Sequence, residues 1–342
     1  MIVSDASELT AEWFSKALGV TVSEVRVADM TIGAMCRMVR AELTTENDAT
    51  SVVVKFPTAD PSTRGLARAM GMYELEVRFY GDLLPLLDGL RTPACHLAAL
   101  DSETGDFTLV LEDLSTRTRP GDVLRESSDA ECAAVLAELA TLQARTWDSP
   151  QTRAMPWLAD PARTIAVFDS MAAGLAPFLA RFGHALKPDQ VTLFERVIPK
   201  AGQWIRSWDG PSVVQHGDLR TDNILFGDDM DGLTATLLDF QTVRLGPPGI
   251  DTAYFLGSSL STATRRARER DFLRDYHQRL GIAGYDLDDC LADYRNGALY
   301  AVYLFCGLSV QVAPSERVDR VIADQSARYA DLALDWDSAG LL

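Results

Sequence analysis

The sequence predicts an α+β protein in two parts, the first rich in strands and the second mostly helical. Up to about residue 112, short runs alternate apolar and polar side chains and are rich in β-branched residues, as strands are. Beyond residue 113 the composition changes to Ala- and Leu-rich stretches with helical spacing. At 342 residues the chain is long enough for two domains, which we expect at 1–112 and 113–342.

The expected elements follow in order along the chain. An apolar stripe predicts a first helix over 7–18, and a second helix is expected over 70–84. Strands are expected over 22–30, 38–44, 51–56, 93–100 and 107–111. A long helix is expected over 129–146, and most of 264–337 is expected to be helical.

Composition and charge limit the possible classes of protein. The hydrophobic fraction of 47% and the charged fraction of 24% are typical of a soluble globular protein. No run of eighteen apolar residues and no secretory signal is visible, and the five scattered cysteines form no C-x-x-C, so we expect a cytoplasmic protein. The net charge of −17 argues against nucleic acid or an anionic membrane as partner. It is compatible with a cationic or neutral substrate, or with a solvated acidic surface.

The most informative segment runs from residue 213 to 240. Two apolar runs, 224–226 and 233–240, bracket the Gly- and Asp-rich stretch 227–232 and predict a β-hairpin. A hairpin brings the start of its first strand and the end of its second to one end, so Asn223 and Asp239 are expected near each other. Asp218 lies on the loop that leads in. Carboxylate and amide oxygens of this kind bind Mg²⁺, usually together with substrate phosphates.

His216-x-Asp218, Asn223 and a strand ending in Asp239-Phe240 follow the order of a kinase catalytic loop. From 215–218 to 238–241 the segment resembles the aminoglycoside phosphotransferase and choline kinase superfamily, closest to its ecdysteroid kinase-like branch. The resemblance implies a bilobal protein-kinase-like fold, with a small antiparallel-sheet N-lobe and a larger, mostly helical C-lobe. The resemblance covers most of residues 20–310, but only the segment 213–256 carries motifs that are specific to the superfamily.

The resemblance also implies roles for particular residues. Asp218 would accept the proton of the attacking hydroxyl, and Asn223 and Asp239 would hold Mg²⁺. Lys55, at the end of a valine run, would contact the α- and β-phosphates and pair with Glu76 on the following helix. Read by themselves, the aspartates could be turn residues and Lys55 a side chain that reaches solvent at a strand edge. Glu74 is the rival partner of Lys55.

Two further segments would contact the nucleotide by the same resemblance. Gly33 lies where kinases carry a phosphate-covering loop, although a single glycine equally suits an ordinary hairpin turn. Backbone groups from Glu112 to Leu114 would bind the adenine edge, the alternative being an edge strand that enters a loop.

Other residues keep two interpretations. Arg220 either offsets charge on the transferred group or is solvated, whereas Asp251 is expected to cap a helix and to orient the catalytic loop. Three aromatic residues either line an acceptor pocket or belong to the core: Trp157, Phe168 and Phe178. Three tyrosines on one predicted helix are candidates to face the cleft, with no contact indicated by the sequence: Tyr294, Tyr300 and Tyr303.

The expected activity is that of a phosphotransferase with an alcohol group as acceptor, dependent on ATP or GTP and on Mg²⁺. The partner is a small-molecule hydroxyl substrate, which could be an aminoglycoside, an amino alcohol, a sugar or a steroid-like alcohol. Two alternatives stay open: a nucleotide-binding kinase-like protein without catalysis, and a protein kinase. The second is disfavoured because A-P-E and a long activation segment are missing. The sequence does not indicate an oligomeric state.

Overall fold

A computed structural model describes residues 1–30, 35–46, 48–230, 232–309 and 314–342. The chain forms two compact units: residues 1–119 with 236–243, and residues 120–235 with 244–342. The first unit therefore runs past residue 112, where the sequence-based proposal places the boundary, and it takes in a short segment from far along the chain.

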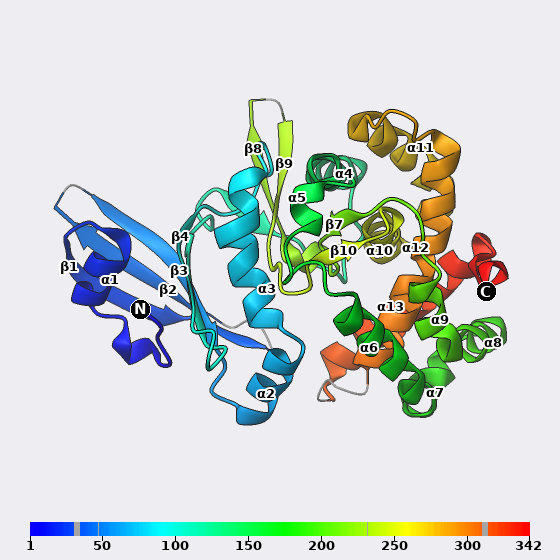
Figure 1. Cartoon of the computed structure of the whole chain (residues 1–342), viewed down its shortest axis with the longest axis horizontal. Helices are drawn as coiled ribbons and strands as arrows, with labels where there is room; N and C mark the ends of the chain where they lie inside the picture. Colours follow the sequence, from blue (N-terminus) through cyan, green and yellow to red (C-terminus); the bar gives the residue numbers. More distant parts are fainter. Residues whose placement is uncertain (31–34, 47, 231, 310–313) are drawn as a thin grey trace. The chain divides into compact units, whose positions relative to one another are not determined.

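A five-stranded antiparallel sheet is the centre of the first unit (Figure 1). Its strands lie in the order β1-β2-β3-β5-β4. Their bounds are β1 Val22–Asp29, β2 Cys36–Thr45, β3 Ala49–Pro57, β4 Cys95–Leu100 and β5 Phe107–Glu112. The strands expected from alternation are all present, with ends shifted by a few residues.

Helix α1 (Ala11–Leu18) packs on one face of this sheet. Its side chain Phe14 is fully buried among alternate residues of the strands, including Val52 and Val54. Successive side chains of a strand point to opposite faces. Lys55, next to Val54, therefore points to the other face, where helix α3 lies.

The helix expected over 70–84 is broken into shorter pieces. Helix α2 (Pro61–Ala69), which the sequence reading missed, ends just before Gly71, and α3 covers Met72–Arg78. Gly71 has φ 72°, a left-handed conformation that glycine adopts without strain. The chain continues as a π-helical turn, Phe79–Leu83, and a 3₁₀ turn, Leu84–Leu86.

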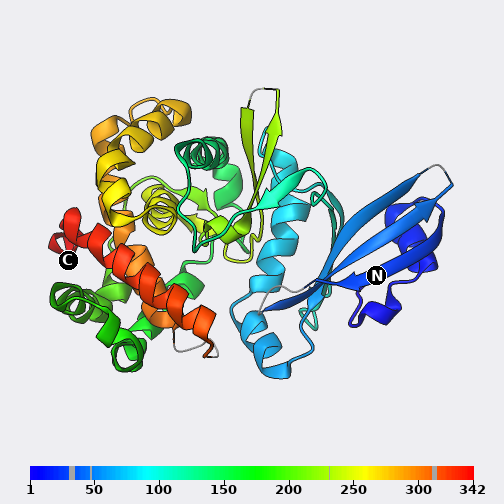
Figure 2. The same ribbon diagram turned by 180° about the vertical axis from the view of Figure 1, so that it is seen from behind.

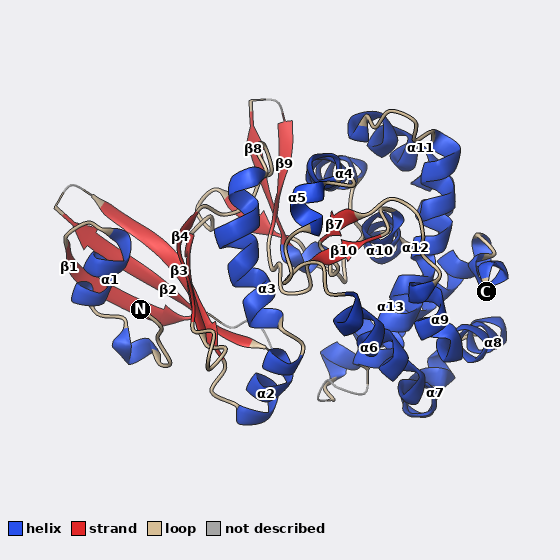
Figure 3. Cartoon of the chain, in the orientation of Figure 1, coloured by secondary structure: helices blue, strands red, loops and turns tan. Residues whose placement is uncertain are grey.

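The second unit is mostly helical (Figure 3). Its longer helices are α4 Asp129–Thr146, α6 Pro161–Met171, α7 Leu175–Phe182, α8 Pro188–Val197, α10 Gly249–Ser259, α11 Thr262–Leu280, α12 Leu287–Leu308 and α13 Glu316–Asp335. The shorter ones are α5 Pro150–Arg153 and α9 Ala201–Arg206. Strands β7 (Val213–Gln215) and β10 (Arg244–Gly246) pair antiparallel, and β8 (Ile224–Asp229) pairs with β9 (Gly232–Leu237). The remaining short strand is β6 (Thr118–Pro120).

Helix α10 forms the core of this unit, because all eleven of its residues are buried. It packs closely on α12: a Cβ on Gly249 would lie 2.0 Å from the carbonyl oxygen of Asp293. Only glycine permits so close an approach. Helix α13 packs against α12 and appears in orange to red in Figure 2.

One stretch, Pro161–Ala185, is long and apolar enough to cross a membrane by length and composition alone. The most apolar 18 residues of this stretch have a mean hydropathy of 1.4, and 28% of them are buried. This stretch was not identified from the sequence. A 3₁₀ turn at Ala172–Gly174 separates α6 from α7 within it. The large apolar side chains of the stretch pack inside the second unit, among them Phe168, Met171, Phe178 and Phe182.

Candidate active site

Lys55 joins two carboxylates in the first unit. Its ammonium group lies 2.7 Å from Oε2 of Glu76 and 2.8 Å from Oδ1 of Asp239. Glu76 sits on α3, and Asp239 follows β9 in the segment 236–243. The rival Glu74 instead pairs with Arg78, at 2.8 Å. Lys55 and Asp239 are therefore in direct contact although they are 184 positions apart in the sequence.

The three members of this cluster differ in exposure. The side chains of Lys55 and Glu76 are 6% and 2% exposed, whereas that of Asp239 is 36% exposed. Burial by itself would lower the pKa of Lys55, but the charge of Asp239, with that of Glu76, raises the pKa well above its usual value. Asp239 is therefore the accessible carboxylate beside the Lys55 ammonium. A partly exposed carboxylate of this kind suits a cation.

Neighbouring side chains hold the two carboxylates in place. Gln241 donates from Nε2 to Oε2 of Glu76 at 3.2 Å, and the ring of Phe240 stacks on Phe79 with centroids 3.5 Å apart. Asp239 between them has φ 64°, an uncommon conformation that Asp and Asn tolerate better than most residues. Gln241 stands where protein kinases have the glycine of D-F-G. The hydrogen bond to Glu76 gives that replacement a positioning role.

The segment proposed to bind adenine ends strand β5. Glu112 donates its N–H to Ala94 at 2.8 Å, so this group is already used. The N–H of Leu114 has no hydrogen-bond acceptor within the described residues. Asp113, which the sequence reading passed over, accepts from Arg40 at 2.7 Å and from Ser51 at 2.8 Å. These bonds tie the segment to β2 and β3. Gly33 lies outside the described residues.

In the second unit, Asp218 lies in a loop where its carboxylate is fully hydrogen-bonded. Oδ1 accepts from Nε of Arg220 and from the hydroxyl of Tyr254, both at 2.8 Å. Oδ2 accepts from the amide of Asn223 at 3.2 Å and from Nη2 of Arg220 at 3.4 Å. The carboxylate is therefore oriented from several directions before any substrate arrives.

Arg220 is partly buried and forms an ion pair with Asp218. Its side chain is 27% exposed, and the charge of Asp218 is the main cause that raises its pKa. Tyr254 also contacts Asp218, and the sequence did not indicate this contact. Burial raises the pKa of Tyr254 well above its usual value, so the hydroxyl stays protonated and donates a hydrogen bond to Asp218.

The side-chain amide of Asn223 uses its donor, Nδ2, in hydrogen bonds, and its acceptor, Oδ1, is available for a ligand. Its Nδ2 donates to the backbone oxygen of Asp218 at 2.9 Å as well as to the carboxylate. Its Oδ1 accepts no hydrogen bond within the described part of the chain, although the residue is only 8% exposed. Among the described residues no group of three or more His, Cys, Asp or Glu could hold a metal ion. Mg²⁺ sites commonly use only one or two protein ligands. Asn223 Oδ1 in the second unit and the Asp239 carboxylate in the first are each oxygen ligands of the type that Mg²⁺ binds.

Asp251 holds the loop that carries Asp218. Its two carboxylate oxygens accept from the backbone N–H groups of His216, at 2.8 Å, and Gly217, at 2.9 Å. The expectation that Asp251 caps a helix was wrong: it lies inside the first turn of α10, whose N-cap is Pro248. The hydroxyl of Tyr300 completes the support by donating to the backbone oxygen of Gly217 at 2.6 Å.

We expect Asp251→Ala to lower the free energy of unfolding by about 2–5 kcal/mol, because it leaves two buried N–H groups without acceptors. Burial raises the pKa of Asp251, against the lowering effect of nearby His216 and the two donors. Urea unfolding followed by circular dichroism measures the change. Asp251→Asn keeps one acceptor oxygen and is expected to cost about half as much. A loss below about 0.5 kcal/mol, the usual range for surface substitutions, would contradict this role.

Most of the other aromatic candidates belong to the core. Trp157, Phe168, Phe178 and Tyr303 are buried, and Tyr303 packs with Phe168 and Trp204. Tyr294 is also buried and donates to Glu269 at 2.8 Å. Tyr300 alone among this set contacts the Asp218 loop within the described residues, through a backbone oxygen.

The chain has the kinase-like fold seen in several solved small-molecule kinases. Over 96% of its length it resembles ADP-bound aminoglycoside phosphotransferase APH(2'')-Ib, 99% of which is covered, with a TM-score of 0.53 and 15% identity. Choline kinase from Cryptosporidium parvum gives a TM-score of 0.54 with 7% identity, covering 93% of this chain and 89% of that one. Spectinomycin phosphotransferase APH(9)-Ia, solved with ADP and spectinomycin, gives 0.54 with 11% identity, covering 98% and 99%. At these identities the similarity shows the fold.

By its sequence the chain belongs to the ecdysteroid kinase-like family. The sequence model of this family matches residues 32–152 and 179–284, which include Lys55, Asp218 and Asp239. An uncharacterized kinase-like protein of Caenorhabditis elegans, D1044.1, is 32% identical over 94 residues. That stretch is 28% of this chain and spans 23% of the relative's length. The resemblance found in the 213–256 segment is thereby confirmed.

Proposed function

We propose that this chain transfers the γ-phosphate of ATP to a hydroxyl group of a small molecule. The observation that carries the proposal is the ammonium group of Lys55 held between Glu76 and Asp239. A buried lysine that served structure alone would need only one partner for its charge. Here a second, accessible carboxylate is added, and this arrangement suits a triphosphate with its metal ion.

The nucleotide would be bound by the first unit. Lys55 would contact the α- and β-phosphates, with Glu76 fixing its position and Gln241 fixing that of Glu76. The free N–H of Leu114 is a donor for the adenine edge. Mg²⁺, held by Asp239 and Asn223, would neutralise charge on the phosphates when bound. GTP carries the same triphosphate as ATP and would contact the same side chains. The proposed phosphate contacts therefore suit either nucleotide.

The acceptor hydroxyl would be oriented by Asp218. Phosphoryl transfer asks mainly for in-line positioning and charge stabilisation, and a carboxylate fixed by Arg220 and Tyr254 provides positioning. Asp218 would accept the hydroxyl proton as the acceptor oxygen bonds to the γ-phosphorus and the bond from that phosphorus to the leaving ADP breaks. The positive charge of Arg220 lies beside Asp218 throughout. In the resting protein Arg220 pairs with Asp218. That Arg220 offsets charge on the transferred group stays a prediction.

A small acceptor is favoured over a polypeptide. The chain passes from Asp239 to the start of α10 at Gly249 within ten residues, and β10 occupies part of that stretch. A protein kinase carries a longer activation segment here, on which the polypeptide substrate docks. The substrates named for the similar structures, spectinomycin and choline among them, are small molecules and support this choice.

A screen for acceptor-dependent ADP release tests the proposal. Purified protein with MgATP would be supplied with aminoglycosides, amino alcohols, sugars and steroid alcohols, and products would be identified by mass spectrometry. At least one hydroxyl compound is expected to raise ADP release and to gain a phosphoryl group. Nucleotide binding without transfer to any compound would instead favour a non-catalytic kinase-like protein.

A further inference from the structure

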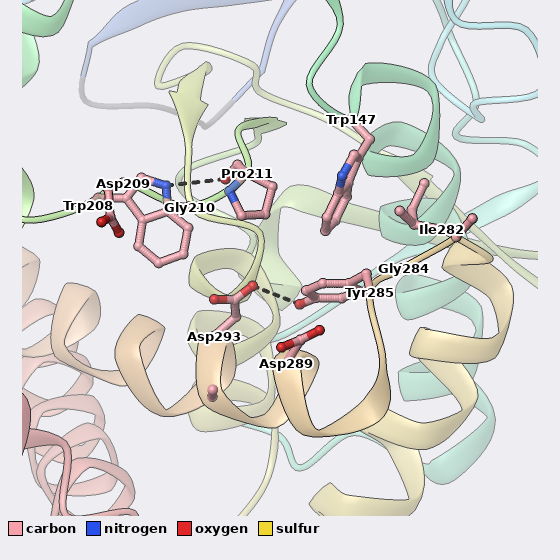
Figure 4. Close-up of a pocket in the computed structure, with 12 residues that line it drawn as sticks. Trp147, Trp208, Asp209, Gly210, Pro211, Ile282, Gly284, Tyr285, Asp289 and Asp293 are labelled. Carbon is pink, nitrogen blue, oxygen red and sulfur yellow. Dashed lines mark hydrogen bonds between the residues drawn. The ribbon is translucent and has the colours of Figure 1, made fainter.

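A cavity of about 470 Å³ lies in the second unit, on elements other than the Asp218 loop (Figure 4). Its walls come from the end of α4, the loop 208–211 before β7, and the segment from Ile282 to the first turns of α12. A cavity of this size is in the range of small-molecule sites. None of its lining residues is a phosphate-site or Asp218-loop residue named above.

Three aromatic side chains form the walls of this cavity. The rings of Trp147 and Tyr285 lie together, with centroids 4.6 Å apart and planes at 60°. Trp208 faces them from the opposite side and donates from Nε1 to the backbone oxygen of Pro211 at 3.2 Å. A Cβ on Gly210 would lie 2.7 Å from the Trp208 ring, so the ring packs directly on the glycine backbone. These contacts fix the aromatic faces before any ligand binds.

Carboxylates form the floor. Asp289 and Asp293 lie one turn apart on α12 and point into the cavity, and Asp209 stands at its edge. Asp293 is 9% exposed and accepts at Oδ2 from the hydroxyl of Tyr285 at 2.8 Å. Its Oδ1 accepts no hydrogen bond within the described residues, and in that part of the chain no Lys or Arg forms an ion pair with any of the three aspartates.

The charge of Asp293 is therefore uncompensated. Burial raises the pKa of Asp293 to about 6, with Asp289 adding to the effect and the Tyr285 hydrogen bond opposing it. At neutral pH the carboxylate is ionised even so, and a bound cation would offset the cost of burying its charge.

We propose that this cavity binds an organic ammonium ion, with its charge on Asp293 and Asp289 and its carbon groups on the aromatic faces. Indole and phenol faces attract cations, and an alkylated ammonium is easily stripped of water. A bare metal ion would leave the three rings without a role, and its oxygen shell would be incomplete among the described residues. The absence of any basic residue from the lining excludes an anion.

The cavity and the Asp218 loop are separate sites on the same helix. Asp293 and Tyr300 are seven residues apart on α12, a rise of about 10 Å, and it is Tyr300 that contacts Gly217. The inference therefore does not depend on the proposed kinase activity. Only binding of an organic ammonium ion to this cavity tests it.

Titration with tetramethylammonium, followed by tryptophan fluorescence and calorimetry, tests the inference. This ion has no hydroxyl, so its binding cannot reflect phosphoryl transfer. Saturable binding is expected to the wild-type chain. Asp293→Asn keeps the shape of the side chain but removes the charge, and it should weaken binding about tenfold or more. The uncharged tert-butanol, of similar shape, should not compete.

Matched variants separate a local effect from a general one. Asp288→Asn changes an exposed aspartate on the same helical turn that does not line the cavity, and it should bind as the wild type does. Trp208→Leu removes a half-buried aromatic face and should also weaken binding, which keeps the test valid if Asp293→Asn fails to fold. No saturable binding by the wild type, or equal binding by Asp293→Asn or by folded Trp208→Leu, would overturn the inference.

Discussion

Replacing Asp239 with asparagine is expected to abolish nearly all phosphoryl transfer, lowering kcat by about a thousandfold or more. The substitution removes the accessible carboxylate proposed to hold Mg²⁺ and one of the two negative partners of Lys55. Asparagine tolerates the left-handed backbone at this position, where φ is 64°, so the fold is expected to survive. Initial rates of ADP release at saturating MgATP measure the change.

A control for this variant is available in the same chain. Asp337 also has a positive φ, 46°, but it pairs with Arg295 in the second unit, at 3.1 Å. Asp337→Asn should leave the rate within about twofold, because its surface ion pair contributes little. If Asp239→Asn kept more than a tenth of the wild-type rate at the same magnesium concentration, Asp239 would not be the metal ligand proposed here.

Asp218→Asn is expected to lower kcat by about 10²–10⁴ while the KM for ATP changes little. The variant keeps the shape of the side chain but cannot accept the hydroxyl proton, and the nucleotide contacts proposed for Lys55 and Leu114 are untouched. Steady-state kinetics with varied ATP and a fixed acceptor separate the two parameters. Tyr254→Phe removes one hydrogen bond to Asp218 and should cause a smaller loss, of about tenfold.

Asp222→Asn serves as the matched control on the same loop. Asp222 is exposed, and it accepts from the backbone of Val123 at 2.8 Å, which an asparagine oxygen can also do. Its rate should match that of the wild type. The opposite pattern for Asp218→Asn, a collapse of ATP affinity with turnover preserved, would show that the roles of the two units are assigned wrongly.

The sequence predicts the elements with strong periodicity and misses those set by backbone geometry. The strands of the first unit and the helix over 129–146 follow from alternation and helical spacing, and the structure has the latter as Asp129–Thr146. The helix over 70–84 was expected as one piece, because its apolar spacing continues through the break. The break depends on the left-handed Gly71 and on the π-helical turn that follows, and neither changes the spacing of apolar residues.

Some residues of the candidate site can be proposed from the sequence, and others are found only in the structure. The order of side chains in kinases suggests Lys55, Glu76, Asp218, Asn223 and Asp239 from the sequence, and their roles stay predictions. The structure joins Lys55 to Glu76 and Asp239, and Asp218 to Asn223. Gln241 and Tyr254 could not be predicted, since each acts through a hydrogen bond to another site residue, and no spacing rule encodes such a bond. Asp251 was expected at a helix N-cap, where aspartate is common, but its carboxylate binds the backbone of the catalytic loop instead.

Equilibrium binding of MgATP to the purified chain tests the central claim most directly. Isothermal titration with and without Mg²⁺ would be compared for the wild type, for Lys55→Met and for Asp239→Asn. The account predicts saturable, magnesium-dependent binding to the wild type that Lys55→Met weakens strongly and that loses its magnesium dependence in Asp239→Asn. Failure of the folded wild-type chain to bind ATP when magnesium is present would contradict it.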